Sequence, residues 1–215
     1  MIKLVAFLGN YGKEYEKTRH NVAWQFEKSL PFADKLSWQT KFKGNYATVE
    51  PETLAQWCKD FGLLTKKDGS PVIIPDEMER IYFLKPETYM NLSGESIIQL
   101  CNFYKIKPEE TLVVHDELEL PFGTVSLKWS GGLGGHNGLR STKQVFGTAD
   151  FWRLRFGLSK PSGIDIASYV LGKFTSDEQI SLSQIFAQSA VLFAKVLFSV
   201  KPENLIQEWG KKKLL

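Results

Sequence analysis

The sequence contains few of the residues that build disulfide frameworks and metal centres. Its 215 residues include two cysteines, Cys58 and Cys101, and three histidines. Two cysteines so far apart exclude a disulfide framework and a cysteine-rich zinc site, and they indicate a reducing, cytoplasmic environment. Three histidines leave little room for a histidine-built zinc centre.

Long apolar runs and common catalytic motifs are also missing. The longest apolar stretch, residues 190–200, is interrupted by Lys195 and is shorter than the ~20 residues of a membrane span. No metalloprotease, serine-hydrolase or Walker A motif occurs, and Asn137 stands where a dinucleotide-binding motif beginning at Gly132 needs its third glycine. The formal charge of +3 permits a nucleic-acid partner without requiring one.

The sequence does contain short apolar runs that alternate with helical patterns. The predicted strands are 3–8, 45–49, 80–84, 111–115, 124–129 and 153–158. Thr175 and Glu178 have the spacing of a capping box ahead of a long amphipathic pattern, and Ser93 is the expected cap of a helix that carries Ile97 and Cys101. This alternation predicts an α/β fold in one domain.

Residues 50–79 are interpreted as an insertion within a single domain that spans residues 1–215. The segment has a helix-like piece at 54–61, followed by a turn-rich stretch at 66–71. A short helix is expected from Pro202 to Trp209, and the lysines at 211–213 are expected to form a solvated tail.

Functional residue types gather in a few short stretches. The three histidines fall within residues 10–21, 115–116 and 131–138, which also carry asparagines and glycines. Such a distribution is typical of a site assembled at strand ends. His20 is a candidate general base, because imidazole titrates near neutrality, and a helix cap or surface histidine is the alternative.

The other stretches also allow two interpretations each. Asp116 could orient His20, or it could join Glu117 and Glu119 in holding Mg²⁺. Asn91 is suited to holding a water or a carbonyl group, and the alternative is a helix cap. The glycine-rich segment 131–138 would let the backbone approach a ligand closely, and a flexible turn would not explain its His136 and Asn137.

Four ordered stretches resemble the bacterial-type peptidyl-tRNA hydrolase family. They are LGNYGKEYEKTRHN at 8–21, KPETYMNLSG at 85–94, HDELELPFG at 115–123 and GGLGGHNGLRS at 131–141. The resemblance implies a mixed β-sheet flanked by helices. It also implies hydrolysis of the ester between peptide and tRNA by a monomeric cytoplasmic enzyme that uses no metal and no cofactor.

The resemblance assigns roles to individual residues. It makes His20 the general base, Asp116 the carboxylate that orients it, and Asn10 a further member of the catalytic group. Substrate binding would fall to Tyr15, Met90, Asn91, His136 and Asn137, and tRNA phosphate binding to Lys128 and Arg155.

Some positions depart from the family pattern. Tyr11 replaces a proline, Glu119 an aspartate and Ser159 a glycine, and Ser126 stands where a second basic residue often occurs. None of these changes removes a catalytic group, but they predict weaker phosphate binding. The alternative function is a non-catalytic RNA-binding relative of the same fold, which would not need the set Asn10, His20, Asn91, Asp116 and Asn137.

Overall fold

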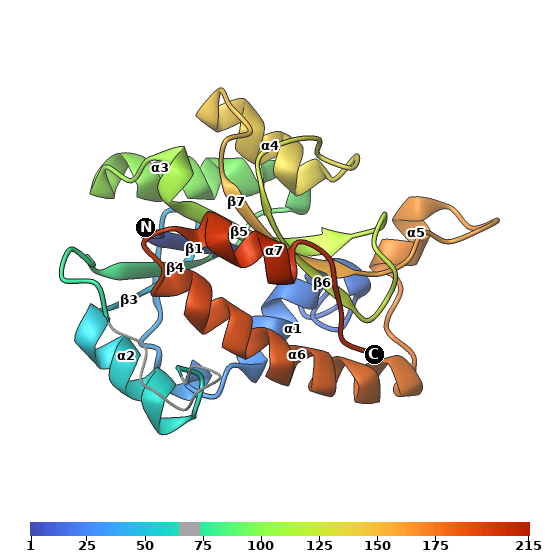
Figure 1. Cartoon of the computed structure of the whole chain (residues 1–215). Coiled ribbons are helices and arrows are strands. Elements are labelled where there is room, and N and C mark those ends of the chain that lie inside the picture. Colours follow the sequence, from blue (N-terminus) through green and yellow to red (C-terminus); the bar gives the residue numbers. More distant parts are fainter. Residues whose placement is uncertain (65–73) are drawn as a thin grey trace.

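A computed structural model describes residues 1–64 and 74–215 as one layered α/β domain (Figure 1). Its eight-stranded sheet has the order β2-β3-β4-β1-β5-β7-β6-β8. The strands are β1 (Leu4–Phe7), β2 (Gln39–Lys41), β3 (Gly44–Val49), β4 (Ile81–Pro86), β5 (Thr111–Glu117), β6 (Thr124–Trp129), β7 (Trp152–Gly157) and β8 (Lys212–Lys213). The turn-rich stretch 66–71 lies outside the described residues.

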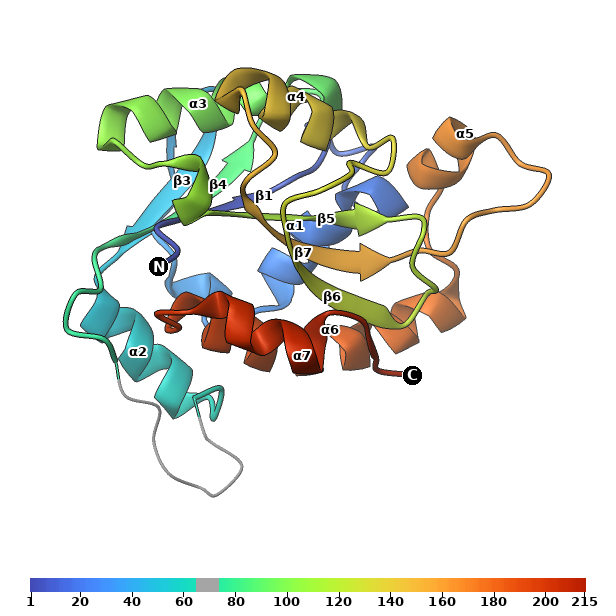
Figure 2. The same cartoon turned by 45° about the horizontal axis from the view of Figure 1, so that its top comes forward.

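The sheet is mixed, which confirms the predicted fold class. Strands β4, β1, β5 and β7 run parallel to one another, whereas β2 and β3 on one side and β6 and β8 on the other are joined by antiparallel pairing. The carboxyl ends of β1, β5 and β7 therefore meet at one edge, where ligand sites of parallel sheets usually form. Figure 2 shows the arrows of β5 and β7 pointing towards α5.

Helices cover both faces of the sheet (Figures 1 and 2). One face carries α3 (Ser93–Tyr104) and α4 (Asn137–Phe146), and the other carries α1 (Val22–Ser29) and α6 (Ser176–Leu197). Alternate residues along β1 enter the two cores: Phe7 packs towards α6, and Leu8, directly after the strand, packs towards α3 and α4. The remaining α-helices are α2 (Pro51–Asp60), α5 (Ile166–Leu171) and α7 (Ile206–Trp209).

Short 3-10 helices complete the described elements. They are η1 (Arg19–Asn21), η2 (Ala33–Lys35), η3 (Met90–Leu92), η4 (Pro108–Glu110) and η5 (Pro202–Leu205). Of these, η1 and η3 lead directly into α1 and α3. The residues of the first two motifs thus lie in tight turns at the starts of helices.

The long C-terminal helix α6 is a core helix. The predicted capping box is confirmed, since Thr175 Oγ1 accepts from the Glu178 amide and the Glu178 carboxylate accepts from the Thr175 amide. By length and composition α6 is apolar enough to cross a membrane. Its apolar residues nevertheless pack against the sheet and α1, as Phe186 and Phe193 do around Phe26.

Two local predictions were wrong. Ser93 is the first residue of α3 and not its cap, because its hydroxyl donates to the Met90 carbonyl within the preceding turn. The C-terminal lysines are only partly a free tail, since Lys212 and Lys213 pair with β6 as β8. Within residues 50–79, the segment interpreted as an insertion, the predicted helix-like piece is confirmed as α2.

Candidate active site

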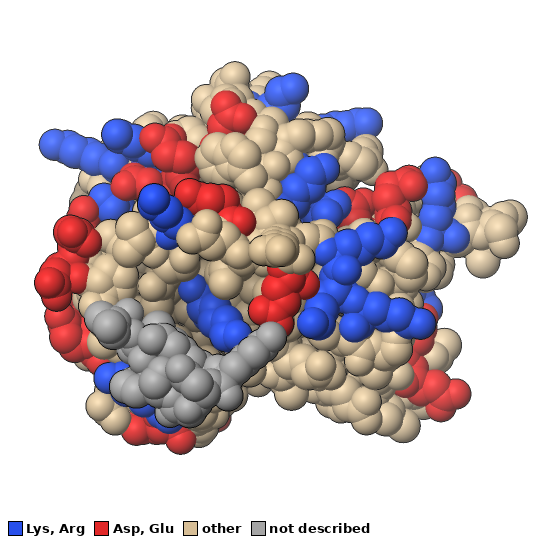
Figure 3. Space-filling model, viewed as in Figure 1, with Lys and Arg blue, Asp and Glu red and all other residues tan. Residues whose placement is uncertain are grey.

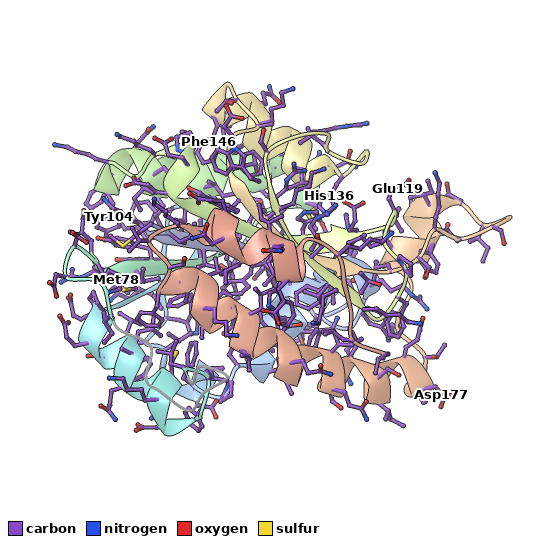
Figure 4. The ribbon with its side chains drawn as sticks, in the orientation of Figure 1. Met78, Tyr104, Glu119, His136, Phe146 and Asp177 are labelled. Atoms are coloured by element: carbon purple, nitrogen blue, oxygen red, sulfur yellow. The ribbon has the colours of Figure 1, made fainter. Side chains whose placement is uncertain are left out.

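Two histidines converge on one oxygen of a buried carboxylate at the carboxyl edge of the sheet. His20 Nδ1 lies 2.8 Å from Asp116 Oδ1, and His136 Nε2 lies 3.0 Å from the same atom. His20 comes from η1, Asp116 from the end of β5, and His136, labelled in Figure 4, from the residue before α4. Three sequence-distant motifs therefore meet in one hydrogen-bond network.

The network fixes which nitrogen of each ring carries a proton. His136 caps α4, because its Nδ1 accepts from the Gly138 amide at 3.1 Å. That nitrogen is unprotonated, so His136 Nε2 carries the proton donated to Asp116. His20 donates to Asp116 from Nδ1, which leaves its Nε2 as a free acceptor in the neutral ring.

The charge of Asp116 controls the pKa of His20. Burial by itself lowers the pKa of His20, but the negative charge of Asp116 and its hydrogen bond outweigh burial and raise that pKa above 6.5. Burial opposes ionisation of Asp116, yet the two histidines hold its pKa well below its usual range. The carboxylate therefore stays ionised, and His20 is a stronger base than an isolated imidazole.

His115 is a buried neutral neighbour of this network. Its ring lies edge-on to the His136 ring at 5.0 Å between centroids, and its Nδ1 donates to the Asp116 carbonyl at 2.6 Å. Burial, followed by the nearby His136, lowers the pKa of His115 well below 6.5. Sequence reasoning gave His115 no role, although its place beside Asp116 in the same motif was a usable signal.

Asn10 lies at the carboxyl end of β1 in an arrangement that orients its amide group. Its Oδ1 accepts from the Met90 amide at 2.8 Å, so its Nδ2 is left as a donor. The backbone of Asn10 exchanges two hydrogen bonds of 2.9 Å with the side chain of Asn21. Asn21 is completely buried and joins the end of β1 to the turn that carries His20; sequence reasoning missed it.

The start of α4 packs tightly beneath the site. A Cβ atom on Gly138 would lie 2.7 Å from both Leu8 Cδ1 and Met90 Sδ. Any larger residue at 138 would require the Leu8 and Met90 side chains to shift, so glycine lets α4 begin this close to η3 and to the end of β1. This close packing sets His136 and Asn137 beside the Asn10 and Asn91 turns.

A cavity of about 780 Å³ opens over the network. All predicted catalytic and substrate-binding residues line it: Asn10, Tyr15, His20, Met90, Asn91, Asp116, His136 and Asn137. Glu117, Gly134 and Gly135, from segments that the sequence analysis singled out, also line it. Sequence reasoning missed an apolar wall and other lining residues: Tyr89, Leu118, Asp165, Ile166, Ala167, Val170 and Leu171. The apolar wall follows β7, in a segment that matched none of the four motifs.

The two predicted phosphate-binding residues lie outside the cavity, on the antiparallel strands next to it. Lys128 is in β6 and Arg155 in β7, and Arg155 Nη1 lies 3.3 Å from Glu117 Oε2. Burial, together with Arg153 and Arg155, lowers the pKa of Lys128. Ser126 is fully buried and accepts from Arg155 Nη2 at 2.6 Å, so this departure orients Arg155 from beneath.

The donor set of the site suits a hydrogen-bond network better than a metal. Within residues 1–64 and 74–215, His20, Asp116 and His136 form the only group of three or more His, Cys, Asp or Glu residues placed to hold a metal ion, and their ligand atoms lie within 4.8 Å of one another. Metal binding at His136 Nε2 would require its Nδ1 to take a proton and give up the α4 cap. Glu117 and Glu119 pair instead with Arg155 and Lys160.

Comparison with known proteins identifies the family. A sequence model described as peptidyl-tRNA hydrolase matches residues 4–214. The chain belongs to the peptidyl-tRNA hydrolase family. The peptidyl-tRNA hydrolase of Treponema pallidum is 42% identical over 218 residues, covering 100% of this chain and 97% of that protein. That of Desulfitobacterium hafniense is 40% identical over 198 residues, covering 90% and 94%.

Solved structures of the family share the fold. The crystal structure of peptidyl-tRNA hydrolase from Acinetobacter baumannii has a TM-score of 0.76 at 32% identity and covers 100% of this chain and 97% of that chain. The likeness extends over the whole described sheet and both helical layers, so the mixed-sheet architecture expected for the family is confirmed.

Proposed function

We propose that this protein hydrolyses the ester bond between a peptide and the 3′ end of tRNA, with His20 as the general base. The observation that carries the proposal is the 2.8 Å contact of His20 Nδ1 with Asp116 Oδ1 on the floor of the cavity. It leaves Nε2 free to accept a proton, and the charge of Asp116 stabilises the imidazolium that then forms.

The reaction is an attack of water on the ester carbonyl. His20 Nε2 takes one proton from a water molecule while the water oxygen bonds to the carbonyl carbon, which gives a tetrahedral oxyanion. The intermediate collapses when the bond to the ribose oxygen of tRNA breaks, and the imidazolium returns its proton to that oxygen. The products are a tRNA with a free hydroxyl group and a peptide carboxylic acid, which releases its proton to the solvent and leaves as the carboxylate.

The asparagines supply uncharged donors for the substrate and the oxyanion. Because Asn10 Oδ1 is occupied by the Met90 amide, Asn10 offers its Nδ2 to a carbonyl oxygen. Asn91 and Asn137 are exposed on the cavity wall, where they can grip the peptide backbone. Tyr15 and Met90 would then contact the substrate as pocket residues, and His136 would support Asp116.

The tRNA is proposed to lie against the basic face next to the cavity. Figure 3 shows Lys and Arg side chains gathered on the right half of this view, around β6 and the C-terminal end. Lys128 and Arg155 lie on these strands and would contact phosphate groups, which gives affinity that depends on salt and little on sequence. We further propose that the enzyme works in the cytoplasm as a monomer, without metal or cofactor.

The test is release of an N-blocked aminoacyl group from tRNA by the purified protein, with and without EDTA. We expect cleavage that survives EDTA and falls about 10²–10⁴-fold in His20→Ala, with tRNA binding unchanged. Arg80→Gln, which alters an exposed ion pair with Glu50 far from the cavity, is the control and should cleave normally. Tight tRNA binding without cleavage would instead indicate the non-catalytic RNA-binding alternative.

A further inference from the structure

The apolar wall of the cavity is carried by a segment that projects from the sheet. The chain leaves β7 after Gly157, and α5 (Ile166–Leu171) stands apart from the two helical layers (Figure 2). Ile166 and Leu171 line the cavity and remain 47% and 43% exposed. The wall has no core of its own, so contacts where it joins the rest of the fold are needed to hold it.

Arg19, the residue before the proposed general base, contacts this segment at several points. Its Nη1 donates to the Lys173 carbonyl at 2.8 Å, and its backbone amide donates to the Gly172 carbonyl at 2.9 Å. Its guanidinium also lies over the Tyr169 ring, 4.5 Å from the centroid. The Tyr169 hydroxyl donates to the Leu158 carbonyl at 2.7 Å and so closes the projecting segment. One arginine thus contacts both α5 and the residues that follow it.

The anchor of Arg19 is the long core helix α6. Arg19 Nη2 lies 2.8 Å from Glu178 Oε2, the oxygen that also accepts from the Thr175 amide at the helix cap. The Arg19 side chain is only 11% exposed. The pair is partly buried, with Glu178 24% exposed, so removing one partner leaves the other charge without compensation in a partly dry position.

We propose that Arg19 is a positioning residue that locks the α5 wall to the turn that carries His20. The wall and the general base His20 then keep a fixed position relative to each other. The wall can therefore select the side chain of the residue esterified to tRNA. This inference rests on the proposed function, because it assigns the wall to the acyl part of that substrate. An apolar wall of Ile166, Val170 and Leu171 favours a large aliphatic side chain over none.

The experiment compares two substrates on one tRNA body, esterified with either N-acetyl-leucine or N-acetyl-glycine. Wild type should have the higher kcat/KM for the leucine substrate. Arg19→Gln should lower that preference about tenfold, which is less than the ~10²-fold that a 1 Å misplacement of reacting groups can cost. Arg19→Lys, which keeps the charge but not the paired donors, should give an intermediate preference.

Hydrogen exchange supplies a second readout that does not depend on turnover. Backbone amides of residues 166–172 should exchange faster in Arg19→Gln, while those in the middle of α6 should not change. Arg80→Gln, which removes a comparable but exposed ion pair with Glu50, should alter neither exchange nor preference. If Arg19→Gln does not fold, the same comparison is made with Arg19→Lys and Tyr169→Phe.

Support requires both changes in the same variant. An equal loss of kcat/KM for the two substrates, or a lost preference without faster exchange, would overturn the positioning role. A wild-type enzyme with no preference for leucine would overturn the assignment of the wall to the acyl side chain. Absence of any wild-type cleavage would contradict the proposed function itself, whereas the exchange data would still report whether Arg19 holds α5.

Discussion

At the scale of single residues, one carboxylate oxygen organises the site. Asp116 Oδ1 accepts from both His20 and His136, and these rings lie 4.9 Å apart between centroids. The second histidine cannot share the work of a base, because its other nitrogen is occupied by the α4 cap. His136 instead holds the carboxylate in place and ionised, so the two imidazoles have different roles despite their similar surroundings.

The pH dependence of cleavage follows from this arrangement. A base acts in its neutral form, so kcat/KM should rise with pH through the raised pKa of His20 and level off above it. Asp116→Asn removes the charge that opposes burial, and the pKa of His20 should then drop. The acid limb of the profile should move to lower pH while the plateau falls, by as much as ~10⁴-fold.

The measurement is kcat/KM against pH for wild type and Asp116→Asn, with Arg80→Gln as a variant distant from the site. An acid limb that stays at the same pH in Asp116→Asn would show that this limb does not report the titration of His20.

Within the motifs, residues with a recognisable chemical role were easier to predict than residues that bond to backbone atoms. His20 and Asp116 were recognisable because their side chains match a motif and a chemical role. Asn21 and His115 lie in the same motifs, but their bonds go to backbone atoms of Asn10 and Asp116. The Asn21 contacts depend on the distance between two turns, which no spacing in the sequence specifies, whereas the His115 contact goes to the adjacent residue.

At the scale of elements, α3 and α4 approach each other without room for a side chain. A Cβ atom on Gly94 would lie 2.3 Å from the Ser141 carbonyl oxygen, and the Gly94 amide donates to Ser141 Oγ. Both helices begin at turns that line the cavity, so their contact also sets the separation of Asn91 and Asn137. The helical periodicity predicted α3, but this contact appears only when two helices are placed side by side.

Gly94→Ala should therefore force the two helices apart. We expect a loss of about 1–3 kcal/mol in the free energy of unfolding, typical of overpacking against a backbone that cannot yield. Urea denaturation measures the change. Gly132→Ala is the matched control, because a Cβ atom there would have no neighbour within 4 Å and its effect should be near zero. Equal stabilities of the two variants would contradict the close approach.

At the scale of the whole molecule, a small net charge is compatible with tRNA binding because the basic residues are unevenly placed. The formal charge is +3, yet Lys and Arg side chains gather on one part of the face in Figure 3. Composition alone left the partner open for this reason. The order of the strands was also beyond local patterns, because periodicity predicts strands and not their neighbours. The family resemblance predicted the mixed sheet, whereas β8 and the α5 wall became apparent only in the structure.

The charge distribution predicts a shallow salt dependence of tRNA binding. Ser126 is buried beneath Arg155 and offers no cation, so Lys128 and Arg155 are the two proposed phosphate contacts beside the cavity. Each phosphate contact contributes about one unit to the slope of log K against log salt concentration. Lys128→Ala should weaken binding similarly for different tRNAs, reduce the slope by about one unit, and raise KM with little change in kcat.

Lys35→Ala is the control, since Lys35 lies over the Trp57 and Phe61 rings, away from β6. A slope that is unchanged in Lys128→Ala would mean that the phosphate backbone binds elsewhere, because a lost ionic contact must release fewer counterions on binding.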